Sequence, residues 1–476
     1  MAPTPAVTAA LEHFGASPTQ FHNCANLKDR LVAAGFSEIS EADTWTGALS
    51  PGGKYFYTRN TSTLVAFVVG GAYNPASPGG FKVVGGHTDS PNIRIKPHSK
   101  RGAGAGGATQ LNVEAYGGGL WHTWLDRDLS VAGRVLVRSP DGSTVTQQLV
   151  DLERPLLTIP NLCIHLQTGD ERAALKLNKE DHLQPILALA DKTLGGGAAA
   201  DDAGVDNFVK GHEPMLLQEV ARKLGCEVSQ IADFELALYD TNKAALSGIN
   251  KEFLASARLD NQATCITSAL AIIEYAGMAD AVAKDADVSL IALFDHEEVG
   301  SASAVGAGSP IMGEAVRRIS SALNTGGGNE DFFQTTLRKS FVISCDQAHA
   351  VHPNYAHKHD KNHAPKMNGG MVIKNNANQR YTTNAFTGFI VREIARRANL
   401  NTQEFVVRND CPCGSTIGPI ISEKTGIRCM DVGMPQLAMH SCREIMGTSD
   451  LDNAVSLFVS FFETFRSLDE MTFGCA

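Results

Sequence analysis

Two short stretches of the chain combine side chains that bind metal ions in proteins. The first reads GGHTDSP and supplies His87 and Asp89. The second reads LFDHEEVGS and supplies Glu297 and Glu298. Each follows on an apolar run that is typical of a buried strand, FKVV before the first and VSLIA before the second. Charged groups at the end of a buried strand are costly unless they are paired or bind a metal. In open α/β sheets, the ligand-binding and active sites lie at the carboxyl ends of the strands.

The neighbouring acids Glu297 and Glu298 could have different roles at a metal site. Neighbouring residues at a strand end point in different directions, so one carboxylate can bind a metal while the other faces an attacking water. A solvated acidic pair in a loop is the alternative interpretation. Asp89 is close enough in sequence to orient the ring of His87, because a metal-binding imidazole usually needs a partner on its second nitrogen. For His87 the alternative is an ordinary histidine at a strand end.

Three further positions carry the same kinds of group. Asp260 opens a predicted helix within ARLDNQA, Asp346 follows the apolar run FVISC, and His440 lies within PQLAMHS. Asp260 could instead be a helix N-cap, and His440 alone reads as a core or loop histidine. His349 and His352 follow Asp346 and could compete as ligands.

Two histidines and three carboxylates together suit a two-zinc site with nitrogen and oxygen ligands. In such a site one carboxylate bridges the ions, and a sixth group, a carboxylate that binds no metal, carries the proton. Each position is a weak signal by itself. Five of them in one chain, most at strand ends or in turns bounded by Gly or Pro, are a much stronger signal for a metal site.

The elements that must position these groups form an α/β domain interrupted by a second, mainly β domain. Strands and helices alternate in residues 1–96 and again in residues 246–476, which favours a layered α/β/α sheet covered by helices. Residues 97–245 instead contain turn-punctuated strand sequences such as LSVAGRVLVRS. The second domain is therefore predicted to be inserted into the first. Besides the helix after Asp260, long helices are predicted at residues 7–35, 311–323, 383–398 and 451–467.

The overall composition narrows the function classes. The chain has 476 residues and a formal net charge of −10, whereas phosphate binding needs clustered Lys and Arg, so we expect no nucleic-acid partner. No run reaches the roughly 18 apolar residues of a membrane span. The N-terminal segment contains no Lys or Arg before Lys28, unlike a secretory signal peptide. Ten scattered cysteines indicate reduced thiols and a cytoplasmic protein.

Seven motifs make the chain similar to a known family. They are GGHTDSP, ARLDN, FDHEEVGS, CDQAHAVHPNY, IKNNANQRYTTNA, GSTIGPI and PQLAMHS. In this order they resemble the aspartyl aminopeptidases of the M18 metallopeptidase family, and the resemblance covers nearly the whole chain. It implies a zinc enzyme that removes N-terminal Asp or Glu from peptides. It also implies an inserted domain used for dimerisation and a tetrahedral dodecamer built from dimers.

The resemblance assigns roles to individual residues. It implies two zinc ions per subunit. Asp260 would bridge the two ions. His87 and Asp346 would complete the first zinc site, and Glu298 and His440 would complete the second. Glu297 would be the general base and acid, and Asp89 would support His87. His165 would reach into the partner subunit's site and support the transition state. Lys374 would pair with the acidic side chain of the substrate. Without the resemblance, His165 reads as a strand-end histidine and Lys374 as a surface lysine.

Three residues depart from the family pattern without removing a ligand or the base. Gln347 stands where Met is expected, Cys442 where an aliphatic residue is usual, and Cys411 lies ahead of Pro412. These departures concern local packing and sensitivity to oxidation rather than the reaction class. Two other hypotheses remain open: a related zinc exopeptidase or deacylase of different specificity, and an inactive relative that serves as a scaffold or cargo. The intact ligand set argues against the inactive relative.

Overall fold

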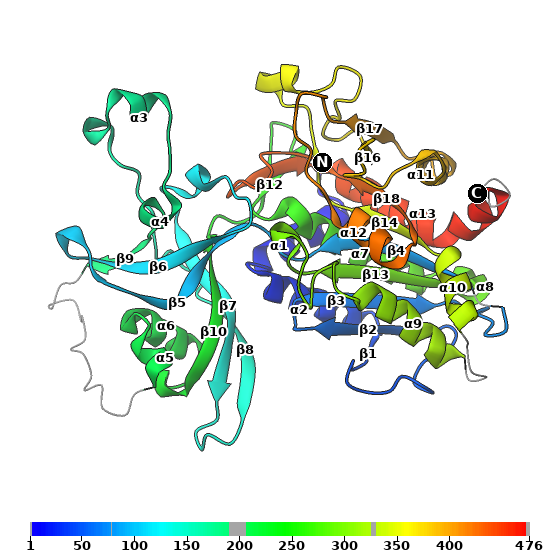
Figure 1. The fold of residues 1–476 in the computed structure, drawn as a ribbon, viewed down its shortest axis with the longest axis horizontal. Coiled ribbons are helices and arrows are strands. Elements are labelled where there is room, and N and C mark those ends of the chain that lie inside the picture. Colours follow the sequence, from blue (N-terminus) through cyan, green and yellow to red (C-terminus); the bar gives the residue numbers. More distant parts are fainter. Residues whose placement is uncertain (1, 78, 190–205, 325–329, 473–476) are drawn as a thin grey trace. The chain divides into compact units, whose positions relative to one another are not determined.

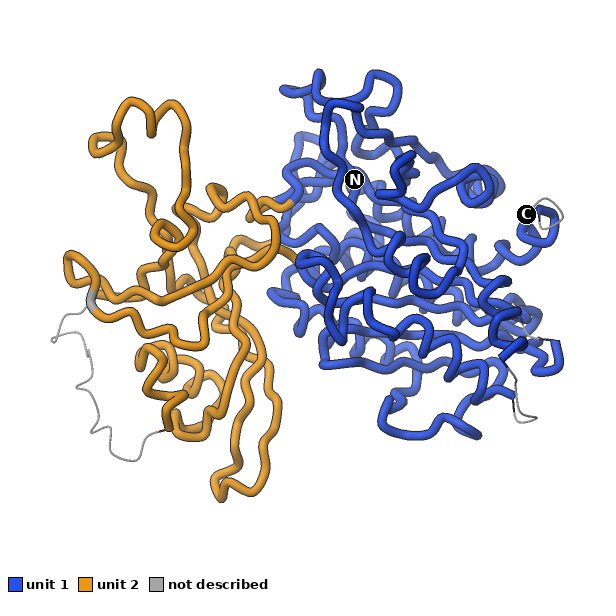
Figure 2. The backbone as a smooth tube through the Cα atoms, in the orientation of Figure 1, with its two compact units in different colours: residues 1–89, 244–439, 444–476 blue, residues 90–243, 440–443 orange. Residues whose placement is uncertain are grey.

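The computed structural model describes residues 2–77, 79–189, 206–324 and 330–472. The chain forms two compact units, which Figure 2 colours separately. The first unit contains residues 1–89, 244–439 and 444–476, and the second contains residues 90–243 and 440–443. Each unit has its own sheet and its own apolar core.

A nine-stranded mixed sheet runs through the first unit (Figure 1). Across the sheet, the order is β1 (Ser37–Glu38), β2 (Lys54–Arg59), β3 (Thr63–Val69), β13 (Val288–Phe294), β4 (Phe81–His87), β14 (Phe341–Cys345), β18 (Arg428–Gly433), β16 (Met371–Asn375) and β17 (Thr402–Val406). The neighbours β13, β4, β14 and β18 run parallel to one another. Parallel strands end at the same edge of a sheet, so the residues that follow these strands meet there.

Helices cover both faces of this sheet, because alternate side chains of its central strands are buried on opposite sides. Along β3, Leu64 and Ala66 join one apolar cluster, while Val65 and Phe67 join the other. On the first face lie α1 (Pro5–Ala16), α2 (Gln20–Ala33), α7 (Leu259–Gly277), α8 (Ala279–Lys284), α11 (Ala385–Arg397) and α13 (Ser449–Thr472). On the second face lie α9 (Ile311–Leu323), α10 (Glu330–Arg338) and α12 (Ile417–Thr425). The predicted α/β/α layering is confirmed.

The helix predicted at residues 7–35 is wrong as one continuous element, because it is divided into α1 and α2. Pro18 explains the break, since a proline disfavours helical backbone in the residue before it. The prediction for residues 311–323 matches α9. The helix predicted from residue 383 starts slightly later, because the side chain of Asn384 caps α11 by accepting the backbone N–H groups of Phe386 and Thr387.

A smaller five-stranded sheet also belongs to the first unit. Its strands, in order, are β11 (Ala245–Ser247), β12 (Phe253–Ser256), β20 (Glu444–Gly447), β19 (Pro435–Leu437) and β15 (Ala348–His349). Strand β12 leads into α7 and so to Asp260, while β15 begins two residues after Asp346. This sheet therefore joins the chain segments that carry two of the predicted metal ligands.

The second unit is built on a six-stranded sheet in which every neighbouring pair of strands is antiparallel. Its strand order is β8 (Val145–Asp151), β7 (Leu129–Arg138), β10 (Ile231–Asp240), β5 (Asn92–Ala103), β6 (Ala108–Tyr116) and β9 (Ile186–Leu189). The described residues of this unit form four α-helices: α3 (Gly169–Ala173), α4 (Lys179–His182), α5 (Asn207–Lys210) and α6 (Pro214–Leu224). This mainly β inserted unit agrees with the predicted fold class.

Within the described parts of the chain, no helix is both long enough and apolar enough to span a membrane. Nine cysteines fall in those parts, and none of the nine forms a disulfide bond there.

Candidate metal centre

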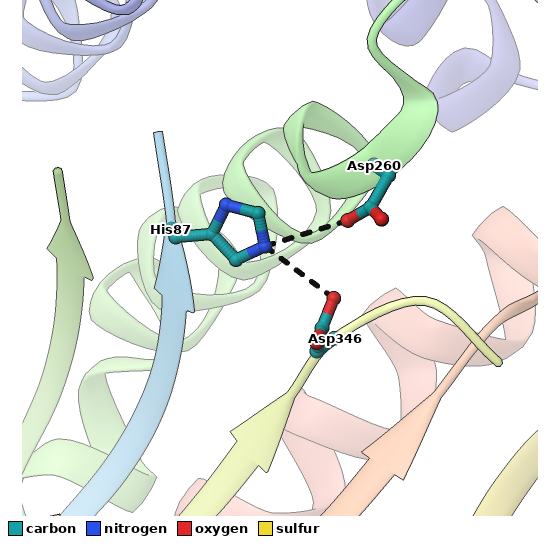
Figure 3. Close-up of side chains that lie close together, drawn as sticks. All are labelled: His87, Asp260 and Asp346. Carbon is teal, nitrogen blue, oxygen red and sulfur yellow. Dashed lines mark hydrogen bonds and ion pairs between the residues drawn. The ribbon is translucent and has the colours of Figure 1, made fainter. Parts of the chain in front are cut away.

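Three strands and one helix deliver predicted site residues to the same region of the first unit. His87 is the last residue of β4, and Asp346 follows the last residue of β14. Glu297 begins a short 3₁₀-helix, Glu297–Val299, just after β13. Asp260 comes from the first turn of α7. Figure 3 shows the carboxylates of Asp260 and Asp346 turned toward one ring nitrogen of His87.

The surroundings of the His87 ring, which is 1% exposed, indicate a cation-binding position. Its Nδ1 lies 3.1 Å from the backbone oxygen of Asp89. Its Nε2 lies 3.4 Å from a carboxylate oxygen of Asp260 and 3.4 Å from one of Asp346. When Nδ1 carries the proton of a neutral ring, the Nε2 lone pair faces carboxylate oxygens, which are also acceptors. A metal ion or a second proton is needed to satisfy this geometry.

Without a metal ion, the second proton is favoured. Burial lowers the pKa of His87, but hydrogen bonds from its ring to three carboxylates outweigh burial and raise the pKa well above its usual value. Those carboxylates belong to Asp260, Asp346 and Asp89. The local field at Nε2 is therefore strongly negative, and it attracts positive charge of either kind.

Asp89 fixes the backbone of the acidic pair. One of its carboxylate oxygens accepts the N–H of Glu297 at 3.1 Å, and the other accepts the N–H of Glu298 at 3.1 Å. The preceding residue, His296, has a left-handed backbone with φ of 64°, so the chain turns sharply as it leaves β13. A carboxylate of Asp89 also lies 3.4 Å from Nδ1 of His87. Asp89 thus contacts both predicted motifs at once.

Burial raises the pKa of Glu297 to about 8. His87 opposes this effect, while Asp346, Asp89 and Asp260 reinforce it. Glu297 therefore gives a carboxyl whose pKa lies close to neutral, where a group exchanges protons most effectively in catalysis. A bound divalent cation would offset the repulsion between these carboxylates.

The donor atoms fit zinc. Ligand atoms of His87, Asp260 and Asp346 all lie within 4.8 Å of one another, and those of His87, Glu297 and Glu298 form a second such group. Imidazole nitrogen and carboxylate oxygen are common zinc ligands. These groups are largely buried, where unpaired charge is costly. The cluster therefore has the chemistry and the spacing of a metal site.

Two ordinary interpretations of these residues are wrong. Asp260 is not the N-cap of α7, because Arg258 occupies that position and Asp260 itself has non-helical backbone angles. Lys374 is not a surface lysine, because it lies on β16 and is 3% exposed. Its ammonium is 3.9 Å from a carboxylate oxygen of Asp346 and 5.4 Å from the centre of the Tyr381 ring. A buried cation thus lies beside a predicted metal ligand.

The competing histidines do not enter the cluster. Among the described residues, the groups able to hold a metal include neither His349 nor His352. The ring of His349 packs against Phe405 instead, and Nδ1 of His352 accepts the backbone N–H of Asn354.

Two predicted site residues belong to the second unit. His440 directly follows the first unit's residue 439, and its Nδ1 lies 3.0 Å from the backbone oxygen of Gly118. His165 is exposed on a short 3₁₀-helix, Ile164–Leu166. The ligand role of His440 and the partner-site role of His165 stay predictions.

Sequence reasoning missed two buried residues that contact this cluster. Glu444 accepts the backbone N–H of Asp260 at 3.0 Å, close to the proposed bridging position. Tyr381, which is 4% exposed, places its ring beside the Lys374 ammonium. Glu444 could have been noticed as an acid within the strand-like run EIMG, four residues after His440. Tyr381 lies in a polar segment and gave no such signal.

Comparisons with known proteins agree with this geometry. A model of the aminopeptidase I zinc metalloproteases, family M18, matches residues 13–462. The chain is 45% identical to a probable aspartyl aminopeptidase of Ricinus communis, over 96% of this chain and 95% of that protein. It is also 45% identical to an aspartyl aminopeptidase of Aspergillus oryzae, over 97% and 96% of the two chains.

Solved structures give the same result. A chain in the cryo-EM structure of the Ape4 and Nbr1 complex superposes with a TM-score of 0.92 and 40% identity, covering 99% of this chain and 89% of that chain. A chain of the S. cerevisiae mApe1 dodecamer superposes with a TM-score of 0.86 and 29% identity, covering 99% of each chain. The buried histidine and carboxylate cluster thus lies in a chain that belongs to the M18 family of zinc metalloproteases.

Proposed function

We propose that the chain is an aspartyl aminopeptidase, which hydrolyses the peptide bond after an N-terminal Asp or Glu with two zinc ions per subunit. One observation carries the substrate class: a buried cation, Lys374, lies 3.9 Å from the predicted metal ligand Asp346. An acidic side chain of the substrate would therefore find a positive charge next to the reacting centre. Curated relatives of the chain that are named aspartyl aminopeptidases support the same conclusion.

The proposed zinc ligands are those implied by the sequence. Asp260 would bridge the ions, His87 and Asp346 would complete one site, and Glu298 and His440 would complete the other. Zinc bound in such sites lowers the pKa of water and polarises a carbonyl group. The orientation of the protein ligands is set by the groups behind them: Glu444 bonds the backbone of Asp260, and the backbone oxygen of Asp89 bonds the ring of His87.

Glu297 would be the general base and general acid. Its carboxylate lies 3.9 Å from Nε2 of His87, so it faces the metal cluster without being one of the five proposed ligands. In the proposed reaction Glu297 removes a proton from the attacking water and then gives it to the leaving amine. The carboxylate of Asp89 accepts the backbone N–H groups of Glu297 and Glu298. It would thereby hold the side chain of the base and the side chain of the neighbouring metal ligand in different orientations.

Lys374 would bind the side-chain carboxylate of the substrate. The chain has a net charge of −10, yet distant surface charges are screened by salt over roughly 8–10 Å. A buried ammonium acts at short range in a medium of low effective dielectric, so it outweighs the distant field. The acidic substrate is thus compatible with an acidic protein.

The proposed assembly is a homo-oligomer of dimers, up to a tetrahedral dodecamer, in which His165 supports the transition state in the partner's site. Side chains around His165 are apolar and exposed in the isolated chain, namely Leu162, Ile164 and Leu166. Such a patch is typical of a contact surface. The free thiols of the described cysteines are consistent with a cytoplasmic location.

The test is hydrolysis of peptides that start with Asp, Glu, Leu or Lys, with and without a chelator. We expect release of Asp and Glu only, and we expect the chelator to abolish it. Chelator-sensitive release of Leu or Lys would be compatible with the metal site but would contradict the role of Lys374. It would favour a related zinc exopeptidase of different specificity. No release from any peptide, with zinc bound, would favour an inactive scaffold.

A further inference from the structure

Asp431 is a fully buried carboxylate that the metal cluster does not use. It lies on β18, the third strand from the β17 edge of the nine-stranded sheet, and is 0% exposed. In the antiparallel pairing of β16 and β18, Asp431 lies directly opposite Lys374. Side chains that lie opposite each other in such a pair project from the same face of the sheet. The carboxylate therefore belongs to the surroundings of the Lys374 side chain.

Its oxygens hold two other segments against the sheet. One oxygen accepts both the backbone N–H of Thr382, at 2.6 Å, and the hydroxyl of Thr382, at 2.7 Å. The second oxygen accepts the hydroxyl of Thr416 at 2.6 Å, just before α12 begins. The hydroxyl of Thr383 accepts the backbone N–H of Asp431 at 3.0 Å. One carboxylate thus joins the segment before α11 and the segment before α12 to β18.

The residue just before Thr382 is Tyr381, whose ring lies beside the Lys374 ammonium. The ring also packs against Phe405, with 6.4 Å between the ring centres. A cation next to the face of an aromatic ring gains most where water is excluded. The bonds from Asp431 to Thr382 fix the backbone one residue away from this ring, and so they set where the ring can lie.

The carboxylate has little freedom to do anything else. A Cβ atom added at Gly418 would lie 2.4 Å from one of its oxygens, so α12 approaches the carboxylate closely. Three donors converge on two oxygens, which suits a carboxylate and not an amide. An asparagine that turned its NH₂ group toward Thr416 would lose the negative charge and reverse the direction of that bond, and one that turned it toward Thr382 would leave a buried backbone N–H without an acceptor, which is costly.

We propose that Asp431 is the positioning residue of the subsite for the acidic side chain: it holds Tyr381 in place beside Lys374, and so fixes the ammonium that the substrate carboxylate meets. This inference rests on the proposed function and deepens it. Asp431 itself touches neither the substrate nor the metal ligands in this scheme.

The test compares Asp431→Asn with a matched control, Asp469→Asn. Asp469 is also 0% exposed, and it bonds Arg428 of the same strand β18 as well as Arg466 of α13. The kinetics of hydrolysis are measured for the wild type and both variants, each loaded with zinc, on peptides that begin with Asp or with its neutral isostere Asn. For Asp431→Asn we expect KM for the Asp peptide to rise about tenfold, with kcat and zinc content near wild type, since a charge-assisted bond network is lost. Selectivity for Asp over Asn falls accordingly, whereas Asp469→Asn keeps it.

Unchanged selectivity in Asp431→Asn would overturn the inference, and so would a loss of kcat that only parallels the loss of stability in both variants. If Asp431→Asn does not fold, Thr382→Val removes one of the three donors, and selectivity should fall by about threefold for a single bond. Unchanged selectivity in Thr382→Val would then count as the overturning result. A wild-type enzyme that does not prefer Asp over Asn would refute the proposed function itself, and this is seen before any variant is made.

Discussion

Glu297 and Glu298 are adjacent in sequence, yet the proposed site gives them different work. Glu297→Gln removes the proton carrier and leaves all five proposed ligands in place, so zinc content should stay near wild type while kcat falls by at least about 10²-fold. Glu298→Gln weakens a ligand, so it should lose zinc first and activity as a consequence. Metal analysis and steady-state kinetics on the same samples separate the two. Near-normal turnover in zinc-loaded Glu297→Gln would refute the role of the base.

Asp89 supports the site from behind, through two backbone N–H groups and the ring of His87. Asp89→Asn leaves a donor facing a donor, so zinc affinity should fall about 10–100-fold, as is typical for groups that orient metal ligands. Competition with a chelator measures this affinity.

Asp450 provides a matched control, because its carboxylate also accepts two backbone N–H groups, those of Asn368 and Gly370. Asp450→Asn should lower stability without changing zinc affinity. Equal effects of the two substitutions on zinc affinity would mean that Asp89 has no specific role at the metal.

At the level of elements, the strand ends could be predicted because local sequence carries the signal. FKVVGGH and VSLIALFD are apolar runs that stop at charged residues, and they become the parallel neighbours β4 and β13. The break between α1 and α2 was missed because apolar spacing continues across Pro18, which ends the helix by its backbone effect alone. The layering follows from alternate burial along the strands, as β3 illustrates.

The rest of the site depends on contacts that no local pattern encodes. Lys374 looks like a surface lysine in the run VIKNN, and only its pairing with β17 and β18 buries it. Asp431 looks like one more polar residue in GIRCMDVG, and its role depends on Thr382 and Thr416, which are distant in sequence. Long-range hydrogen bonds of this kind appear only once the chain is folded.

The contact between α1 and α2 predicts a pH effect on stability. His13 is buried, and its Nε2 lies 2.9 Å from the side-chain oxygen of Asn23 in α2, which in turn bonds the backbone of Thr88 next to His87. Burial is the main cause that lowers the pKa of His13 to about 4; the bond to Asn23 opposes it, and the charges of Arg30 and Arg258 add to it. In the unfolded state His13 is protonated with the ordinary histidine pKa of about 6.5, whereas in the folded state it stays neutral to a lower pH.

Stability from a neutral His13 is complete above about pH 6.5 and is lost as the pH falls toward 4, by up to about 3 kcal/mol. His13→Gln cannot titrate, so its stability relative to wild type should improve over this range, whatever its value at pH 7. Urea unfolding of both proteins at several pH values measures the difference. A difference that stays flat with pH for His13→Gln would contradict the assignment.

At the scale of the whole molecule, the proposed oligomer predicts that no single subunit holds a complete site. An inactive Glu297→Gln chain still carries His165, and an inactive His165→Ala chain still carries Glu297. In a symmetric dimer that exchanges His165 residues, a mixed pair restores one of its two sites, and random mixing at equal amounts makes half of the pairs mixed. An unpurified equal mixture should therefore recover about a quarter of wild-type activity, and particles selected as mixed pairs should recover about a half.

The two variants are mixed after reversible dissociation or are co-expressed with different tags, and mixed particles are purified through both tags before assay. Mixing each variant with itself is the control, because it reveals recovery that comes only from refolding. If His165 acts within its own subunit, the mixed particles stay as inactive as the separate variants, since every subunit lacks one of the two groups. Recovery in double-tagged particles thus distinguishes a shared site from a merely adjacent contact, and it does so without knowledge of the number of subunits in the complete assembly.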